Sequence, residues 1–248
     1  MLLIGIRYSP WTERVRLVLR HHQLSYNYEE HTLLLGMPRL CWQMRRMSPN
    51  LTVPALIDGT NHLMDSFQIA RYLDRLGQKS RLIPDQWIDL IAEFNVQAEL
   101  GCSAVRVLML ERMKHSQEAR LAALPDFVPT CLRPSLGGMA KLGMAYIRKE
   151  FSISAESSAQ SRVDLKSFLV LLRRRLTQAG GKYIMGELSY ADLIAVTVLQ
   201  GVLPVSNRFL ELKAPIRQIW TDEVFKIEFV DLLQWRDQIY EELGQKST

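Results

Sequence analysis

The chain has 248 residues, of which 48% are hydrophobic and 23% charged, and its formal net charge is +5. This length allows one or two domains whose hydrophobic core needs no disulfide or metal to be stable. The composition is not that of a disordered or collagen-like chain. The positive charge is modest and no nucleic-acid-binding motif accompanies it, so we expect a solvated basic surface rather than a nucleic-acid partner.

Neither a membrane protein nor a disulfide-stabilised one is expected. No apolar run approaches the ~20 residues needed to cross a bilayer, and the apolar N-terminal run stops at Arg7, too early for a signal peptide. Three cysteines are too few and too widely spaced for a disulfide framework or a zinc site: Cys41, Cys102 and Cys131. We therefore expect a cytoplasmic protein that binds no metal.

The first third of the chain alternates strand and helix patterns. An apolar run at 2–7 predicts a buried strand, and Ser9 and Pro10 suit the N-cap and first position of a helix through Arg20. Further strands are predicted within 24–35, at 53–57 and at 62–64, with a short helical or irregular stretch before the third and a turn at 58–59 before the fourth. A helix then opens at Asp65, with Gln68 able to complete a capping box. The predicted order is β-α-β-α-β-β-α.

The rest of the chain has only helical patterns. A polar break at 77–84 is predicted to be a linker, and one long helix should follow over 87–115. Ser189 and Asp192 predict a capping box before the apolar run 193–199, which is typical of a helix in the middle of a domain. Other segments predict further helices: 141–151, 162–179 and 224–243.

Four stretches together resemble the cytosolic glutathione transferases. Residues 7–17 (RYSPWTERVRL) resemble the active-site segment of that family, closest to the serine and cysteine branches such as the tau and omega classes. Residues 48–59 resemble the segment around the family's cis-proline, Asp65-Ser66 its acidic–serine pair, and 186–192 its C-terminal N-capping motif. The resemblance implies a thioredoxin-like, glutathione-binding domain over 1–78 and an all-helical domain over 86–248 that carries the second-substrate site. It also implies a homodimer.

Ser9 is the first candidate for catalysis. A free thiol with a pKa near ~8.5 is mostly protonated at neutral pH, whereas conjugation needs the thiolate. A hydroxyl that donates to the sulfur stabilises the thiolate, and so does the positive end of a helix, where Ser9 is predicted to lie. Thr12 and Tyr8 are rival hydroxyls. The omega branch has cysteine at this position, so a serine disfavours a reductase that forms a mixed disulfide with glutathione.

The resemblance also implies the residues that bind glutathione as co-substrate. A cis bond at Val53-Pro54 would expose the Val53 backbone to the cysteinyl part of glutathione, and Ser66 would hold the γ-glutamyl carboxylate at a helix N-terminus. Asp65 stands where the family usually has glutamate, and its side chain is one methylene shorter. Three arginines precede Ser48, and Arg45 is the weakly preferred candidate for the glycyl carboxylate: Arg39, Arg45 and Arg46.

The second substrate should bind between Trp11 and the long helix at 87–115. Four residues of that helix lie at helical spacing there: Cys102, Arg106, Met109 and Met113. A stripe like this is more often core than pocket, and Arg106 is the exception because a cation in an apolar cleft could prefer an anionic substrate. We select Trp11, Arg106 and Met109 as the candidate pocket.

These residues predict a transferase that attacks an electrophilic, mostly apolar small molecule. Ether cleavage, dehalogenation or isomerisation would use the same thiolate with a different leaving group. An alternative from another class is a glutathione-binding scaffold with little turnover, because fold does not fix function. The segment Pro125 to Phe151 matches no expected element, and its role is left open.

Overall fold

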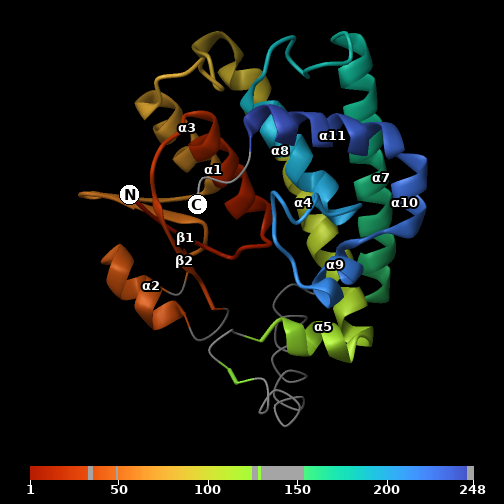
Figure 1. Cartoon of the computed structure of the whole chain (residues 1–248), viewed down its shortest axis with the longest axis horizontal. Helices are drawn as coiled ribbons and strands as arrows, with labels where there is room; N and C mark the ends of the chain where they lie inside the picture. The colour runs from red at the N-terminus through yellow and green to blue at the C-terminus, as the bar shows by residue number, and fades with distance from the viewer. Residues whose placement is uncertain (33–35, 49, 125–127, 130–153, 245–248) are drawn as a thin grey trace.

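The computed structural model describes the chain except residues 33–35, 49, 125–127, 130–153 and 245–248. In the described residues a small sheet with three helices comes first, and a larger group of helices follows (Figure 1). The three early helices are α1 (Pro10–His21), α2 (Met37–Met44) and α3 (Ser66–Leu76). The predicted β-α-β-α-β-β-α order is confirmed.

The sheet has four short strands in the order β2-β1-β3-β4. They are β1 (Leu2–Gly5), β2 (Asn27–Glu30), β3 (Ala55–Asp58) and β4 (Asn61–Met64). Strand β1 pairs parallel with β2 and antiparallel with β3, which in turn pairs antiparallel with β4. This mixed topology is that of a thioredoxin-like domain.

Alternating residues of the central strands face two different layers of helix. Leu3 and Leu56 belong to the main core with α1 and α3, whereas Ile4 and Ala55 pack with Leu40 of α2 in a smaller cluster. Successive side chains of a strand point to opposite faces, so apolar runs as short as these can cover both layers. The sheet therefore lies between α1 and α3 on one face and α2 on the other, and this packing fixes the start of α1 relative to β3.

The described part of the second half of the chain contains only helices and the loops that connect them. It comprises η1 (Asp85–Trp87), α4 (Ile88–His115), α5 (Gln117–Ala122), α7 (Ala155–Gln178), α8 (Tyr190–Val198), η4 (Leu199–Gly201), α9 (Ala214–Trp220), α10 (Glu223–Glu228) and α11 (Val230–Leu243).

The predicted helices of this half differ from the observed ones in four places. Helix α7 begins earlier than predicted because Ser154 and Ser157 form a capping box before it. The predicted single segment 224–243 is two helices, α10 and α11, separated at Phe229, whose backbone (φ −120°, ψ 34°) is not helical. Helices α5 and α9 were not predicted, and the predicted helix at 141–151 lies outside the described residues.

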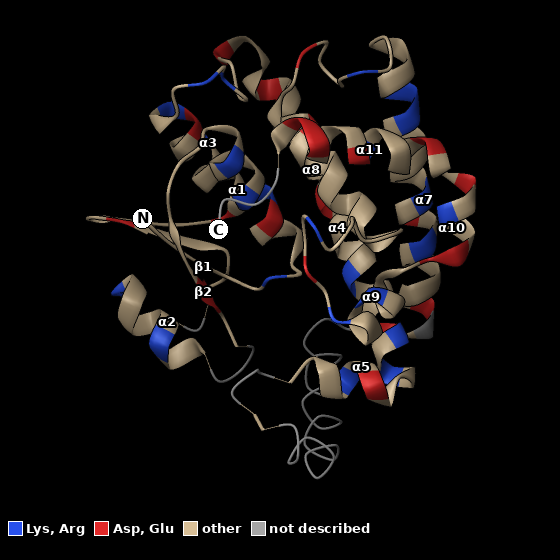
Figure 2. Ribbon diagram, in the orientation of Figure 1, with Lys and Arg blue, Asp and Glu red and all other residues tan. Residues whose placement is uncertain are grey.

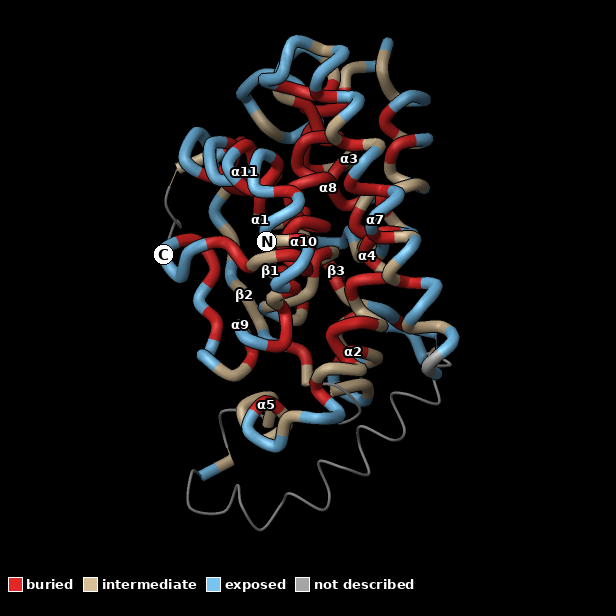
Figure 3. The backbone as a smooth tube through the Cα atoms, turned by 90° about the vertical axis from the view of Figure 1, so that its right-hand side faces the viewer, coloured by how far each residue is buried: buried red, intermediate tan, exposed pale blue. Residues whose placement is uncertain are grey.

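Helix α8 joins the two halves of the molecule. All nine of its residues are buried, and the tube of α8 is coloured accordingly in Figure 3. It packs against both α4 and α1. Its predicted capping box is confirmed: the backbone N–H and hydroxyl of Ser189 both donate to Asp192, at 2.8 Å. Burial raises the pKa of this carboxyl to about 6.

The predicted linker folds over one buried carboxylate. Asp74 of α3 accepts hydrogen bonds from the His22 ring (2.9 Å), the Arg81 guanidinium (2.8 Å) and the backbone N–H groups of Leu82 and Ile83. A fully buried carboxylate needs such partners, because an unpaired charge is strongly disfavoured in the interior. Asp74 therefore ties the end of α1, α3 and the linker together.

The surface is mixed in charge. Along α10 a lysine lies between glutamates, whereas α7 carries more lysine and arginine than aspartate and glutamate (Figure 2). In the part of the chain that the structure describes, no helix is both long and apolar enough to span a bilayer.

Candidate functional site

The sheet register brings three predicted site segments to one end of the sheet. Ile4 pairs with Ala55, and Ala55 pairs with Met64 on its other side. The residues that adjoin this row therefore leave or enter the sheet at the same end. They are Ser9 after β1, Val53-Pro54 before β3, and Asp65-Ser66 after β4.

Ser9 occupies the N-cap position of α1 but does not cap it with its side chain. Its backbone is extended (φ −74°, ψ 127°), and its hydroxyl makes no capping hydrogen bond. Its backbone is fixed instead: its N–H donates to Ile6 O at 2.9 Å, and its carbonyl accepts from Glu13 N at 3.0 Å. The half-buried hydroxyl thus lies at the positive end of a 12-residue helix without serving that helix.

The rival hydroxyl of Thr12 serves the fold. Thr12 is fully buried, and its Oγ1 accepts a hydrogen bond from Ile6 N at 3.2 Å. Gly5 faces it so closely that a Cβ at this position would collide with the Thr12 side chain. Only glycine fits there without a shift, so the end of β1 and the first turn of α1 are locked together.

Tyr8 is half-buried and faces the helical domain. Its ring meets Trp220 of α9 edge to face, with 6.3 Å between centroids. Burial, assisted by the charge of Glu30, raises the pKa of the Tyr8 phenol to about 12. The phenol is therefore protonated at neutral pH and can donate a hydrogen bond.

The peptide bond between Val53 and Pro54 is cis, as the family resemblance implies. Pro54 is buried and Val53 half-buried. Because Pro54 directly precedes Ala55, the partner of Ile4, this bond lies beside the end of β1. The backbone of Val53 thus borders the segment that leads to Ser9.

Asp65 caps α3 from an unusual backbone conformation. Its Oδ1 accepts from Phe67 N (3.1 Å) and Gln68 N (2.9 Å), so its capping role is confirmed, whereas no reciprocal bond from Gln68 completes the box. Its φ of +70° is rare for a residue with a side chain, and such strain tends to persist at functional sites. The adjoining Ser66 is buried, and its carbonyl accepts from the Tyr190 hydroxyl at 3.3 Å.

The three arginines before Ser48 are all exposed. Arg39 is held by Glu29, with 2.7 Å between Nη2 and Oε2. Arg45 ends α2 in a left-handed conformation, with φ 51°. No contact in the described residues selects Arg45 over Arg46 as a ligand for a carboxylate.

Trp11 and the fully buried Arg14 connect the first turns of α1 to α4. The Trp11 indole N–H donates to Glu99 Oε2 at 2.6 Å, and Arg14 Nη1 binds the other oxygen, Oε1. Arg14 also donates to Asn95, Cys102 and Thr197. Burial alone would lower the pKa of Arg14, but Cys102, Tyr190 and Glu99 raise it overall.

The predicted stripe on α4 lies partly against Trp11 and partly in the core. The Arg106 guanidinium lies over the Trp11 ring, 5.2 Å from its centroid, and burial lowers the pKa of Arg106. Met109 and Met113 are 7% and 4% exposed and belong to the helical core. Cys102 is fully buried, and burial raises the pKa of its thiol. The structure thus brings Trp11 and Arg106 together and places Met109 within the helical core.

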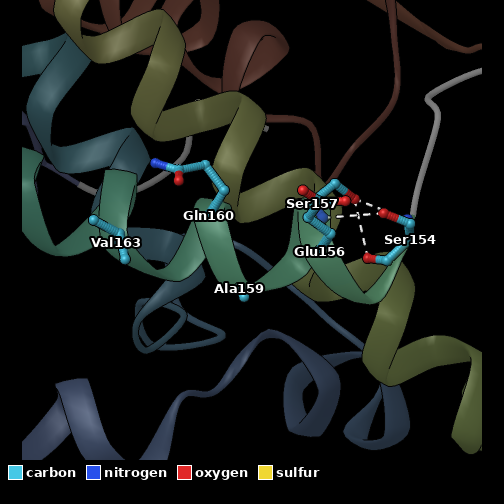
Figure 4. Close-up of a pocket in the computed structure, with 6 residues that line it drawn as sticks. All are labelled: Ser154, Glu156, Ser157, Ala159, Gln160 and Val163. Carbon is cyan, nitrogen blue, oxygen red and sulfur yellow. Dashed lines mark hydrogen bonds between the residues drawn. The ribbon is translucent and has the colours of Figure 1, made fainter.

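A separate hollow lies at the start of α7. It is shallow, encloses about 550 Å³ and is lined by Ser154, Glu156, Ser157, Ala159, Gln160 and Val163 (Figure 4). Its two serines are occupied by the capping box. Among the residues described, no group of histidine, cysteine, aspartate or glutamate could hold a metal ion.

Sequence reasoning missed Glu99, Asn95 and Arg14. The one usable signal was Arg14, a cation on the otherwise apolar face of a predicted helix, since a buried arginine implies a partner. Nothing in the sequence pointed from Arg14 to Glu99, 85 residues away.

Comparisons with known proteins agree with this architecture. The family model "Glutathione S-transferase, N-terminal domain" matches residues 8–76. Glutathione S-transferase Z1 from Arabidopsis thaliana is 37% identical over 207 residues, which cover 82% of this chain and 77% of that protein.

Two solved structures share the fold at low identity. A glutathione S-transferase from Methylobacillus flagellatus with GSH bound has a TM-score of 0.61 at 14% identity and covers 99% of both chains. The β-etherase LigF from Sphingobium sp. strain SYK-6 also has a TM-score of 0.61 at 14% identity, and covers 98% of this chain and 97% of its own.

Proposed function

Because the chain belongs to the cytosolic glutathione transferase superfamily, a family of enzymes, we propose that it activates glutathione as a thiolate at the start of α1. The thiolate attacks an electrophilic, mostly apolar second substrate. The observation that carries this proposal is the Ser9 hydroxyl, which lies at the N-terminus of α1 and makes no capping hydrogen bond. A hydroxyl donor and a helix dipole both favour the charged form of a sulfur placed there.

The serine assignment is supported by what its two rivals do. The Thr12 hydroxyl is buried and accepts a backbone hydrogen bond. The Tyr8 ring packs on Trp220. The Thr12 hydroxyl is thus committed to the fold. Ser9 is preferred over Tyr8 because it stands at the N-terminus of α1, which favours a serine-type enzyme similar to the tau branch.

Glutathione would lie across the end of the sheet. We assign the Val53 backbone, exposed by the cis bond before Pro54, to the cysteinyl part of glutathione. The N-terminus of α3, with Ser66 and Asp65, would take the γ-glutamyl end, because helix N-termini attract carboxylates. Holding the tripeptide in this way removes much of the entropic barrier to attack.

The second substrate would enter beside Trp11 and Arg106. Its identity decides whether the outcome is conjugation, ether cleavage, dehalogenation or isomerisation, since all four begin with the same thiolate. The shared fold with a β-etherase keeps ether cleavage among them. Met109 lies in the helical core, so it would act on this site only through its packing there.

The assembly and domain limits are further proposals. We place the domains at 1–78 and 86–248, because α3 ends at Leu76 and the next element begins at Asp85. The family relationship favours a cytoplasmic homodimer in which the N-terminal domain of one subunit meets the C-terminal domain of the other.

Calorimetric titration with glutathione and with S-hexylglutathione tests the proposal. We expect both to bind, the hexyl derivative more tightly, because its chain would fill the apolar part of the cleft. Absence of binding by either at millimolar concentration would contradict the transferase proposal and favour a scaffold that uses the fold without its chemistry.

A further inference from the structure

We propose that Glu99 is a positioning residue that fixes the indole ring of Trp11 and thereby the wall that the second substrate meets. The inference rests on the proposed function, because it concerns the same cleft. It assigns to α4, in the helical domain, control over a residue of the glutathione-binding domain. Its expected effect falls on second-substrate affinity and leaves glutathione affinity unchanged.

The Glu99 carboxylate is oriented from two sides. Oε2 accepts from the Trp11 indole N–H at 2.6 Å, while Oε1 is bound by Arg14. Arg14 cannot move freely, because it also donates to Cys102 Sγ (3.0 Å) and Thr197 Oγ1 (3.3 Å). A carboxylate oriented by a buried guanidinium offers its second oxygen in one direction only, which gives the indole one preferred rotamer.

The face of the indole is covered from the same helix. The Arg106 guanidinium lies 5.2 Å from the centroid of the Trp11 ring. Residues seven apart return to one side of a helix, so Glu99 and Arg106 approach the ring from positions about two turns apart on one face of α4. The edge and the face of Trp11 are thus both set by α4.

The position of this cluster separates it from the glutathione contacts. Trp11 follows Ser9 by two residues, and the side chain of Glu99 is 37% exposed, so the pair borders solvent. Apart from Ser9, which is assigned to the sulfur, the segments assigned to glutathione come from before β3 and after β4, and neither contains a residue of this cluster. A change at Glu99 therefore alters the surface that Trp11 forms beside the glutathione sulfur, and not the residues that hold the rest of the tripeptide.

Two variants separate positioning from stability. Trp11→Phe keeps an aromatic ring beneath Arg106 and keeps the Arg14–Glu99 pair, but removes the indole donor. Glu99→Gln keeps an acceptor oxygen but removes the charge that Arg14 requires. Glu93→Gln is the matched control, because Glu93 is an exposed glutamate nearly two turns earlier on the same helix.

The readout is the ratio of the Kd for glutathione to that for S-hexylglutathione, measured by calorimetry on the full chain. We expect Trp11→Phe to reduce this preference for the hexyl form about tenfold, as loss of one charge-assisted hydrogen bond allows, with glutathione affinity unchanged. Glu99→Gln should reduce it in the same direction and also lower Tm. The double variant should reduce the ratio no further than Trp11→Phe alone, because one interaction is being removed twice.

Three results contradict the inference. An unchanged ratio in both variants would do so, and so would additive losses in the double variant or an equal loss in Glu93→Gln. Failure of the wild-type chain to bind either compound is a different result, since it overturns the proposed function and this inference with it.

Discussion

The polar groups at the two ends of α1 differ in how fully they are hydrogen-bonded within the protein. At the C-terminal end, Asp74 is fully buried and accepts from the His22 ring, the Arg81 guanidinium and two backbone N–H groups. At the N-terminal end, the Ser9 hydroxyl is half-buried and makes no capping bond. The difference indicates that one end is an anchor whose hydrogen bonds are satisfied internally. At the other end it supports the proposed role of the Ser9 hydroxyl as a donor to glutathione.

Loss of the Asp74 carboxylate should have the largest effect on the free energy of unfolding. We expect Asp74→Ala to lower the free energy of unfolding by about 3–5 kcal/mol, because it leaves buried donors and a cation without their acceptor. Urea unfolding measures this, with the exposed Asp85→Ala as control. A loss below about 1 kcal/mol would mean that the linker is held by its other contacts.

The anchor should also make stability depend on acid. Burial alone would raise the pKa of Asp74, but hydrogen bonds from His22, Arg81, Leu82 and Ile83 lower it from 3.8 to about 2. A carboxyl whose pKa is depressed in the folded state contributes stability above its unfolded pKa and loses it as pH falls through the folded one. We expect wild type to lose about 2 kcal/mol more than Asp74→Asn as the pH falls from 5 towards 2.

Several parts of this contrast were predictable because their signals are local. Pro10 at the first position of α1 and the Ser189–Asp192 box before α8 each follow from a few adjacent residues. The cis bond at Pro54 was implied by the family resemblance of its segment and not by the local residues alone. The break at Phe229 could not be predicted, because residues 223–243 contain neither glycine nor proline and their sequence suits one continuous helix.

The contacts that complete the site are the least predictable part. Trp11 and Glu99 are 88 residues apart, and a glutamate in a long helix is usually solvated, so spacing alone could not pair them. The buried state of Thr12 depends on its close approach to Gly5, which only the packing of α1 on β1 creates.

Two hydroxyls at the N-terminal end of α1 have different roles: Thr12 holds the fold, whereas Ser9 is proposed to bind the sulfur. We expect Thr12→Val to lower the free energy of unfolding by about 1–2 kcal/mol, because the buried N–H of Ile6 loses its acceptor. Specific activity of the folded variant should change little. Thr12→Ser, which keeps the hydroxyl, is the control for that bond. If Thr12→Val abolished turnover without loss of stability, the choice of Ser9 would be wrong.

Tyr8 should give the smallest effect. We expect Tyr8→Phe to change kcat by less than about threefold, because it keeps the ring that packs on Trp220 and removes only a phenol assigned no role in thiolate formation. Steady-state kinetics with glutathione and chlorodinitrobenzene measure this. A loss of about a hundredfold would transfer the role of sulfur ligand from Ser9 to Tyr8.

The most direct test of the central claim is the pKa of the glutathione thiol when it is bound. Thiolate absorbance in the ultraviolet, followed against pH in the complexes of wild type and Ser9→Ala, gives that pKa for each. We predict a wild-type value at least about one unit below the ~8.5 of a free thiol, and a Ser9→Ala value close to the free one at similar glutathione affinity. The same lowered pKa in both complexes would contradict the account, because the thiolate would then form without the Ser9 hydroxyl.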